Sequence, residues 1–150
     1  MDWQARYQSG DTPWDEGAPH PALLDFIAET GPFEGRILVP GCGLGHDTRA
    51  VSTPANHVIG LDIAPGAVAK AMAFPKTGRE KYVLADLFDL APELRSSFDW
   101  VVEHTCFCAI DPSMRSAYAA AVAGALKPGG QLFAIFYLDP DRDRQPPYGV

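Results

Sequence analysis

The stretch Arg36-Ile37-Leu38-Val39-Pro40-Gly41-Cys42-Gly43-Leu44-Gly45-His46-Asp47 contains an apolar run too short for a helix, followed by three glycines at alternating positions. This pattern predicts a β-strand that runs into a glycine-rich loop. Because glycine has no Cβ, such a loop can turn sharply and let a ligand approach the main chain closely. The stretch therefore predicts a ligand-binding turn at the C-terminal end of a strand.

A second apolar run, residues 57–61, ends on Asp62, twenty-one residues after Gly41. Dinucleotide-type folds place a carboxylate at about this separation, where it binds the ribose hydroxyls of the ligand. The glycine loop and this carboxylate together predict a nucleoside site at the ends of two strands.

Composition limits the classes of partner. The chain has 150 residues, 47% of them hydrophobic, and a net charge of -7, and we expect one domain over residues 1–150. The acidic balance argues against nucleic acid or an anionic membrane and favours a small-molecule partner. No apolar run approaches the roughly 18 residues that a membrane span needs. Residues 1–4 also lack the layout of a signal peptide, so we expect a cytoplasmic protein.

The chain has three cysteines, Cys42, Cys106 and Cys108, in or beside the ends of predicted strands. An odd number in this arrangement does not predict a disulfide framework. The spacing of Cys106 and Cys108 does not match a zinc knuckle, so no metal site is expected. Cys106 and Cys108 are interpreted as small buried side chains rather than as nucleophiles.

The rest of the chain alternates between helical and strand patterns. Helices are expected at residues 21–30, 45–52 and 64–74, and from a cap at Asp111 through 126, while further strands are expected at 82–85, 98–102 and 131–137. This order predicts an α/β, Rossmann-like fold with a mostly parallel sheet covered by helices on both faces. Ligands in such folds bind beyond the C-terminal ends of the strands, where the glycine loop, Asp62, Asp86 and residues 103–105 fall.

Trp3, Tyr7 and Trp14 lie in the first 19 residues, among Gly, Pro, Asp and Gln without helical periodicity. We expect this irregular segment to be a lid or arm. The three rings can either cover a ligand or simply pack against the edge of the core.

The glycine spacing helps to choose the ligand. The third glycine, Gly45, comes one residue earlier than in the dinucleotide fingerprint, which makes NAD the second choice. An adenosine ligand without phosphates needs a ribose acceptor and little positive charge, and the strand ends offer acids rather than Arg or Lys. S-adenosylmethionine meets these requirements, and it also carries a cationic sulfonium.

Five motifs, in this order, resemble the thiopurine S-methyltransferase family, which includes thiol and halide methyltransferases among the class I S-adenosylmethionine-dependent enzymes. They are residues 3–15, 39–47, 60–63, 85–88 and 98–105, and the likeness covers nearly the whole chain. The resemblance implies methyl transfer from S-adenosylmethionine to a thiol, thiopurine or halide. The methyl acceptor and the oligomeric state stay open.

The resemblance also implies roles for individual residues. Those expected to contact the cofactor are Trp3, Tyr7, Gly41, Cys42, Gly43, Asp62, Ile63, Asp86, Leu87, Glu103 and Thr105, with Asp62 on the ribose and Asp86 and Leu87 beside the adenine. Those expected to border the substrate are Trp14, Phe107 and Tyr137. Asp86 has an alternative role as the cap of the segment that follows the strand.

Glu103 and His104 are the candidates for proton transfer, by position alone. A thiol is partly ionised at neutral pH, so a dedicated base is optional. His104 can equally be a histidine that is hydrogen-bonded at a strand end, and Asp47 can serve only to compensate the dipole of the short helix that it begins.

The chain differs from the family pattern in two places. Val39 stands where many class I enzymes carry an acid, so no carboxylate is assigned to that role. The family continues beyond five strands with a helix and two more strands, whereas this sequence ends at residues 146–150, and we expect a C-terminally truncated chain. A non-catalytic cofactor-binding domain and an NAD-dependent oxidoreductase are therefore kept as alternatives.

Overall fold

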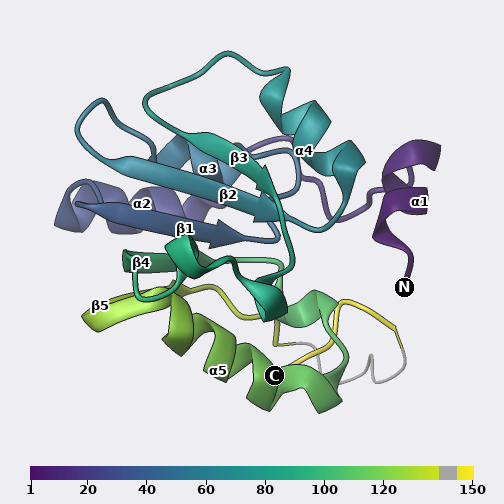
Figure 1. Ribbon diagram of the computed structural model, residues 1–150. Helices are drawn as coiled ribbons and strands as arrows, with labels where there is room; N and C mark the ends of the chain where they lie inside the picture. The colour runs from purple at the N-terminus through teal and green to yellow at the C-terminus, as the bar shows by residue number, and fades with distance from the viewer. Residues whose placement is uncertain (139–144) are drawn as a thin grey trace.

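The predicted strand before the glycine loop forms the centre of a five-stranded parallel sheet with the order β3-β2-β1-β4-β5 (Figure 1). The structure is a computed structural model that describes residues 1–138 and 145–150. Its strands are β1 (Arg36–Pro40), β2 (His57–Asp62), β3 (Lys81–Leu84), β4 (Phe98–Glu103) and β5 (Leu126–Ala134). The expected α/β architecture with a parallel sheet is confirmed.

Helices and short 3-10 turns connect the strands. The helices are α1 (Trp3–Ser9), α2 (Pro21–Thr30), α3 (His46–Val51), α4 (Pro65–Met72) and α5 (Arg115–Ala125). The 3-10 turns are η1 (Leu87–Asp89), η2 (Pro92–Leu94), η3 (Phe107–Ala109) and η4 (Pro112–Met114). None of the helices described here has the length and apolar character that crossing a bilayer requires.

Alternation along β1 builds a core on each face of the sheet. Ile37 and Val39 pack on one face with Leu23 of α2 and Val51 of α3. Leu38 packs on the other face, in the cluster that includes Tyr118 of α5. Because successive side chains of a strand point to opposite faces, a strand that is buried on both sides needs an almost continuous apolar run, which residues 37–39 supply.

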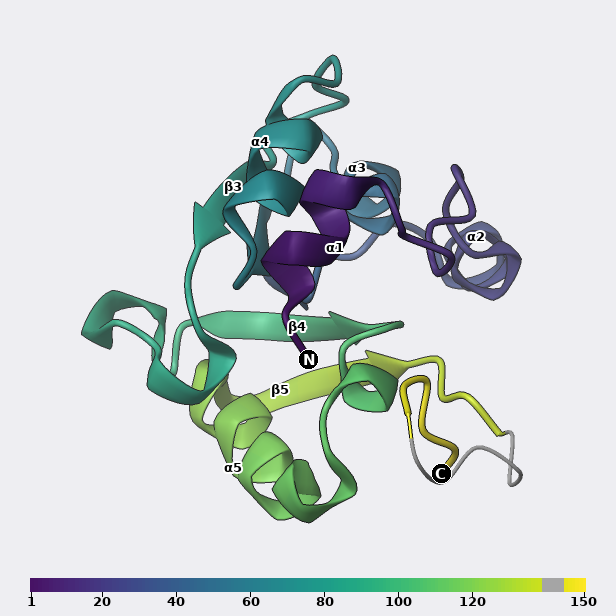
Figure 2. The same cartoon turned by 90° about the vertical axis from the view of Figure 1, so that its right-hand side faces the viewer.

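The chain changes direction across the sheet at β1. Ile37 pairs with Val58 of β2 on one side and with Trp100 of β4 on the other. The C-terminal ends of β1 and β4 therefore meet at a topological switch point, the usual location of ligand sites in open α/β sheets. Figure 2 views the molecule from the side toward which the β1 and β2 arrows point in Figure 1, with α1 and α4 in front of these ends.

The N-terminal segment differs from the prediction of an irregular arm, because residues 3–9 form α1. Asp2 caps this helix by accepting a hydrogen bond from the Ala5 N–H. The helix is docked on α4, where the Gly66 N–H donates to Gln4 Oε1 and Lys70 Nζ donates to the Tyr7 carbonyl. A helix of seven residues is marginal alone, so tertiary contacts that the local sequence does not reveal stabilise it.

The last strand also differs from the prediction, since β5 begins at Leu126 rather than at residue 131. The N–H groups of Ser96 and Ser97 donate to the carbonyls of Gly124 and Ala125 at the end of α5. These bonds lie at the end of α5, which is Ala125 and thus one residue before the predicted end, and they align the chain that follows beside β4. The pairing of β4 with β5 has a register shift between Phe98 and Trp100.

Candidate active site

The glycine loop follows β1 in the conformation that its sequence requires. Gly41, Gly43 and Gly45 have φ angles of 58°, 53° and 78°, in the left-handed region that side chains disfavour. A Cβ on Gly41 would lie 2.9 Å from the Cβ of Cys106, which follows β4. The loops after β1 and β4 are thus in direct contact, and only glycine fits at this position.

Asp62, at the end of β2, fixes the glycine loop from the other side. Its Oδ2 accepts from the Gly43 N–H at 2.9 Å and its Oδ1 accepts from the Ala64 N–H at 2.9 Å. The residue is only 7% exposed, and burial raises the pKa of its carboxyl above the ordinary value, although these backbone hydrogen bonds oppose the shift. The structure therefore places the predicted ribose acceptor against the loop, with the loop conformation dependent on it.

The residues predicted beside the adenine lie at the ends of β2 and β3. Ile63 is 57% exposed, so its side chain is accessible beside the buried carboxylate of Asp62. Asp86 is half-buried, and its Oδ1 accepts from the Phe88 N–H, so it does cap η1. The side chain of Leu87 is buried in the core, which leaves its backbone as the part that a ligand can reach.

The N-terminal rings form a cluster above the glycine loop. Trp14 Nε1 donates to the Tyr7 hydroxyl at 3.2 Å, and the Trp3 ring meets the Trp14 ring edge to face at 5.3 Å. The Tyr7 hydroxyl lies 3.0 Å from where a Cβ of Gly43 would be. Burial raises the pKa of Tyr7 to about 12, so it stays a neutral donor. Tyr7 and Trp14 therefore cover the glycine loop, and they also pack against each other.

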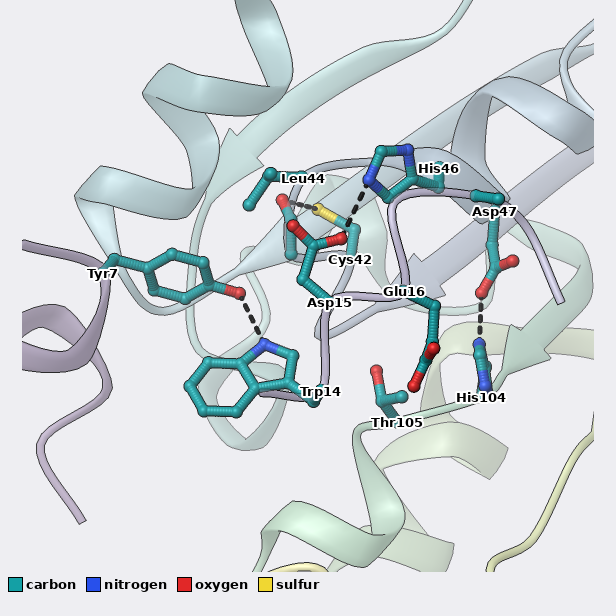
Figure 3. Close-up of a pocket in the computed structure, with 12 residues that line it drawn as sticks. Tyr7, Trp14, Asp15, Glu16, Cys42, Leu44, His46, Asp47, His104 and Thr105 are labelled. Carbon is teal, nitrogen blue, oxygen red and sulfur yellow. Dashed lines mark hydrogen bonds and ion pairs between the residues drawn. The ribbon is translucent and has the colours of Figure 1, made fainter. Parts of the chain in front are cut away.

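A pocket of about 50 Å³ lies between this cluster, the glycine loop and the end of β4 (Figure 3). The polar side chains around it come from three parts of the chain. They are Asp15 and Glu16 before α2, His46 and Asp47 in α3, and His104 and Thr105 after β4. The pocket is therefore the place where the two candidates His104 and Thr105 meet residues from other elements.

Two histidine–aspartate pairs, neither of which the sequence predicts, lie in this pocket (Figure 3). His104 Nδ1 is 2.6 Å from Asp47 Oδ2, and His46 Nε2 is 3.0 Å from Asp15 Oδ1. Burial of Asp47 opposes its ionisation, but hydrogen bonds from His104 and from the His20 N–H outweigh burial and hold the pKa of Asp47 below its ordinary value. Asp47 is thus more than a helix-dipole residue, because it orients His104.

Glu103 does not reach the pocket, which corrects its assignment as a candidate base. Its carboxylate is fully buried, where Oε1 accepts from the N–H groups of Cys106 and Phe107 at 2.9 Å and Oε2 accepts from the Tyr118 hydroxyl at 2.5 Å. Burial raises the pKa of this carboxyl. The side chain alternation of β4 points Glu103 into the core below η3, where it stabilises the loop that carries His104 and Thr105.

The structure separates two predicted substrate residues from the pocket. Phe107 packs edge to face on Tyr118 and on Phe136, in each case with ring centres 5.1 Å apart. Tyr137 follows β5, and its carbonyl accepts from the Val150 N–H. Neither residue lines the pocket. Phe107 instead packs against α5, which its place next to a predicted strand end does not reveal.

Cys42, Cys106 and Cys108 are free thiols. Cys42 lines the pocket, and burial raises the pKa of all three, so they are not activated nucleophiles. Within residues 1–138 and 145–150, no three His, Cys, Asp or Glu side chains are grouped so that they could hold a metal ion.

The parallel sheet, the glycine loop and the acid at the end of β2 define a Rossmann-like fold of the class I methyltransferase type. A solved structure described as "DhpI-SAM-HEP complex" superimposes with a TM-score of 0.72 at 25% identity, covering 93% of this chain and 64% of the other. Another, described as "Conversion of a Disulfide Bond into a Thioacetal Group during Echinomycin Biosynthesis", gives a TM-score of 0.77 at 28% identity, covering 91% and 59%.

The family follows from the sequence comparisons. The chain belongs to the thiopurine S-methyltransferase (TPMT) family, whose model matches residues 1–150. It is 38% identical over 152 residues to thiocyanate methyltransferase 1 of Brassica oleracea, and 37% identical over 153 residues to probable thiol methyltransferase 2 of Arabidopsis thaliana. Each match covers 99% of this chain and 66% of the plant protein, so the chain spans just under two thirds of the length of these relatives.

Proposed function

We propose that this chain transfers the methyl group of S-adenosylmethionine to a small soft nucleophile, with a thiol as the preferred class. The observation that carries the proposal is the family match over residues 1–150, together with relatives named as thiol and thiocyanate methyltransferases. The pocket geometry supports it, because the rings of Tyr7 and Trp14 and the loop residue Gly43, which Asp62 holds by a hydrogen bond, meet at one small volume.

The charges around the switch point fit a cationic nucleoside better than a pyrophosphate. Carboxylates of Asp15, Glu16, Asp47, Asp62 and Asp86 lie along this edge. The nearby cations are occupied, since Arg49 Nη1 donates to the Leu44 carbonyl and Lys70 Nζ to the Tyr7 carbonyl. A dinucleotide would place two phosphates beside acids, whereas a sulfonium is attracted by them. The arrangement of charged side chains at this edge therefore favours S-adenosylmethionine over NAD.

The residues that would hold the cofactor follow from their positions. Asp62 would accept from the ribose hydroxyls with the lone pairs that its two backbone bonds leave free. Ile63 and the backbone at Leu87 would border the adenine, and Gly41 to Gly43 would adjoin the amino-acid part. When bound, S-adenosylmethionine supplies an electrophilic methyl group that the acceptor sulfur takes with its lone pair, leaving S-adenosylhomocysteine.

The protein contributes mainly alignment and exclusion of water in this proposal. Tyr7 and Trp14 close the pocket over the glycine loop, and Thr105 lines its far side. Holding two reactants in line and excluding solvent can lower a barrier by about 7–11 kcal/mol in favourable cases. No covalent intermediate with the protein is needed, which agrees with the raised pKa values of the three thiols. A cytoplasmic location and a small-molecule partner stay predictions from composition.

Calorimetric titration with S-adenosylhomocysteine and, separately, with NAD tests the proposal. We expect binding of S-adenosylhomocysteine only, and we expect Asp62→Asn to weaken it by about 1 kcal/mol or more, as for a lost charge-assisted hydrogen bond. Asp111→Asn is the matched control, because Asp111 is exposed and only caps η4. Methylation of a small thiol is then measured. NAD binding would overturn the proposal, and cofactor binding without any turnover would leave a cofactor-binding domain.

A further inference from the structure

Three imidazole rings lie at the pocket or beside it, and the hydrogen bonds of His46 exclude it as a base. Arg49 Nη2 lies 3.1 Å from His46 Nδ1, and a guanidinium can only donate, so Nδ1 is the acceptor. His46 Nε2 then carries the proton that bonds Asp15 Oδ1 at 3.0 Å. Both ring nitrogens are engaged, and no lone pair is left for a substrate proton.

His20 is excluded by a different contact. Its Nδ1 accepts from the Ala22 N–H at 3.1 Å, which caps the beginning of α2. Protonation of this nitrogen by a substrate would break the cap. The His20 ring meets the His104 ring edge to face at 4.7 Å, and it thereby helps to fix the plane of His104.

His104 has the opposite tautomer. The hydrogen bonds to Asp47 hold the pKa of its carboxyl below the ordinary value, so Asp47 is ionised at neutral pH and can only accept. His104 Nδ1 therefore carries the proton of the 2.6 Å bond, and Nε2 of the neutral ring has a lone pair. None of the described residues forms a hydrogen bond with this nitrogen. Of the three rings, only His104 offers a free basic nitrogen, and it lines the pocket.

We infer that His104 is the general base that deprotonates a neutral thiol acceptor and that Asp47 is the positioning residue that sets its tautomer. This inference rests on the proposed function and deepens it. The proton moves from the acceptor S–H to His104 Nε2, leaving a thiolate and an imidazolium paired with Asp47, and it is later released to water. His104 is the catalytic residue of this step, whereas Asp47 acts through it.

The charges of the pocket also favour proton transfer to His104. Asp15, Glu16 and Asp47 face the pocket with carboxylates, and Glu103 lies buried behind His104. These carboxylates stabilise the imidazolium that His104 becomes when it takes the thiol proton.

The test compares acceptors that need a base with acceptors that do not. Methylation of a small aliphatic thiol and of iodide is measured for the wild type, His104→Gln and Asp47→Asn over a range of pH. We expect both variants to lower kcat/KM for the thiol by about 10–30-fold near neutral pH, because only about 3% of a thiol with a pKa near 8.5 is ionised there without a base. We expect kcat/KM for iodide to change little. The thiol defect should shrink as the pH approaches about 8.5, where free thiols ionise unaided.

Equal losses with thiol and iodide, or a defect that persists at high pH, would show that His104 and Asp47 are only structural and would overturn the inference. A second measurement does not depend on turnover. The absorbance of a chromophoric aromatic thiol is recorded with the protein, with and without S-adenosylhomocysteine, at a pH where the free thiol is mainly protonated. A thiolate spectrum that His104→Gln abolishes supports the inference, and a thiol that stays protonated in the wild type contradicts it.

The two proposals fail in different ways. If the wild type methylates no acceptor at all, the proposed function is wrong for this chain, and the thiolate spectrum alone decides the role of His104. If the wild type methylates thiols and His104→Gln does so equally well near neutral pH, the function stands and the base is refuted.

Discussion

Asp47 and Glu103 illustrate how side chain direction, which sequence does not show, decides what a carboxylate can do. Asp47 lies in α3 just after the glycine loop, and Glu103 is the last residue of β4. Asp47 contacts His104 in the pocket, whereas Glu103 contacts Tyr118 and two backbone N–H groups in the core. Glu103 and His104 were both candidates for proton transfer only because they are adjacent in the sequence. No sequence feature links residue 47 to residue 104, since that contact depends on how α3 and β4 meet at the sheet edge.

A substitution of Glu103 separates its structural role from proton transfer. Glu103→Gln keeps an oxygen for the N–H groups of Cys106 and Phe107 and can donate to the Tyr118 oxygen. The raised pKa of Glu103 means that its stabilising effect is complete below its unfolded pKa of about 4.3 and is lost as pH rises through the folded pKa. We therefore expect the free energy of unfolding of the variant to rise relative to the wild type between pH 4 and 8, in urea titrations.

Glu103→Leu is the comparison. It leaves two buried N–H groups without an acceptor, and we expect a loss of about 1–3 kcal/mol for each. The interpretation would be contradicted if Glu103→Gln were less stable at pH 8 than at pH 4 relative to the wild type. A large loss of thiol methylation in a folded Glu103→Gln protein would restore Glu103 as a candidate base.

At the scale of elements, the order of strands and helices was predictable because their patterns are local. The apolar run of β1, the stop at Gly31 and the cap at Asp111 each act within a few residues. Helix α1 and the start of β5 were not predictable, since both depend on partners far away in the chain, namely Gly66 and Lys70 for α1 and residues 96–97 for the end of α5. A sharp turn at the glycines of the loop was expected from the sequence, but the close approach of Cys106 to Gly41 was not.

Residues 10–20, which we call the strap, connect α1 to α2 across the pocket, and we expect Asp15 to control its opening. Asp15 bonds His46, which is partly buried, so Asp15→Asn should lower the local opening free energy by about 1 kcal/mol. Hydrogen exchange of the strap amides, followed by mass spectrometry, should then be about fivefold faster while β1 amides are unchanged.

The strap contains its own matched control. Asp11 forms an ion pair with Arg6, but its side chain is 63% exposed, and exposed pairs contribute little. Asp11→Asn should therefore leave exchange in the strap nearly unchanged. Equal acceleration in the two variants would show that the Asp15–His46 contact is not a tether.

The whole molecule has an open sheet edge at β5, which pairs only with β4 among the described strands. Leu132 is 43% exposed there, and an unpaired edge with apolar side chains promotes association between copies. We expect sedimentation velocity to show concentration-dependent association that Leu132→Lys reduces. Met72→Lys is the matched control, because Met72 is 65% exposed but lies on α4, which packs against β2 and β3 rather than β5. A reduction of the same size in both variants would point to general charge repulsion.

The position of β1 in the sheet also has a consequence for how the polypeptide is made. β1 lies between β2, which follows it directly, and β4, which begins only at Phe98. A ribosome that synthesises about 5–20 residues per second therefore completes one side of β1 seconds before the other. During this interval Leu38, which packs against Val101 in the finished protein, has no permanent neighbour on that side. A nascent chain that stops before β4 is thus expected to be a substrate for chaperones rather than a folding unit of its own.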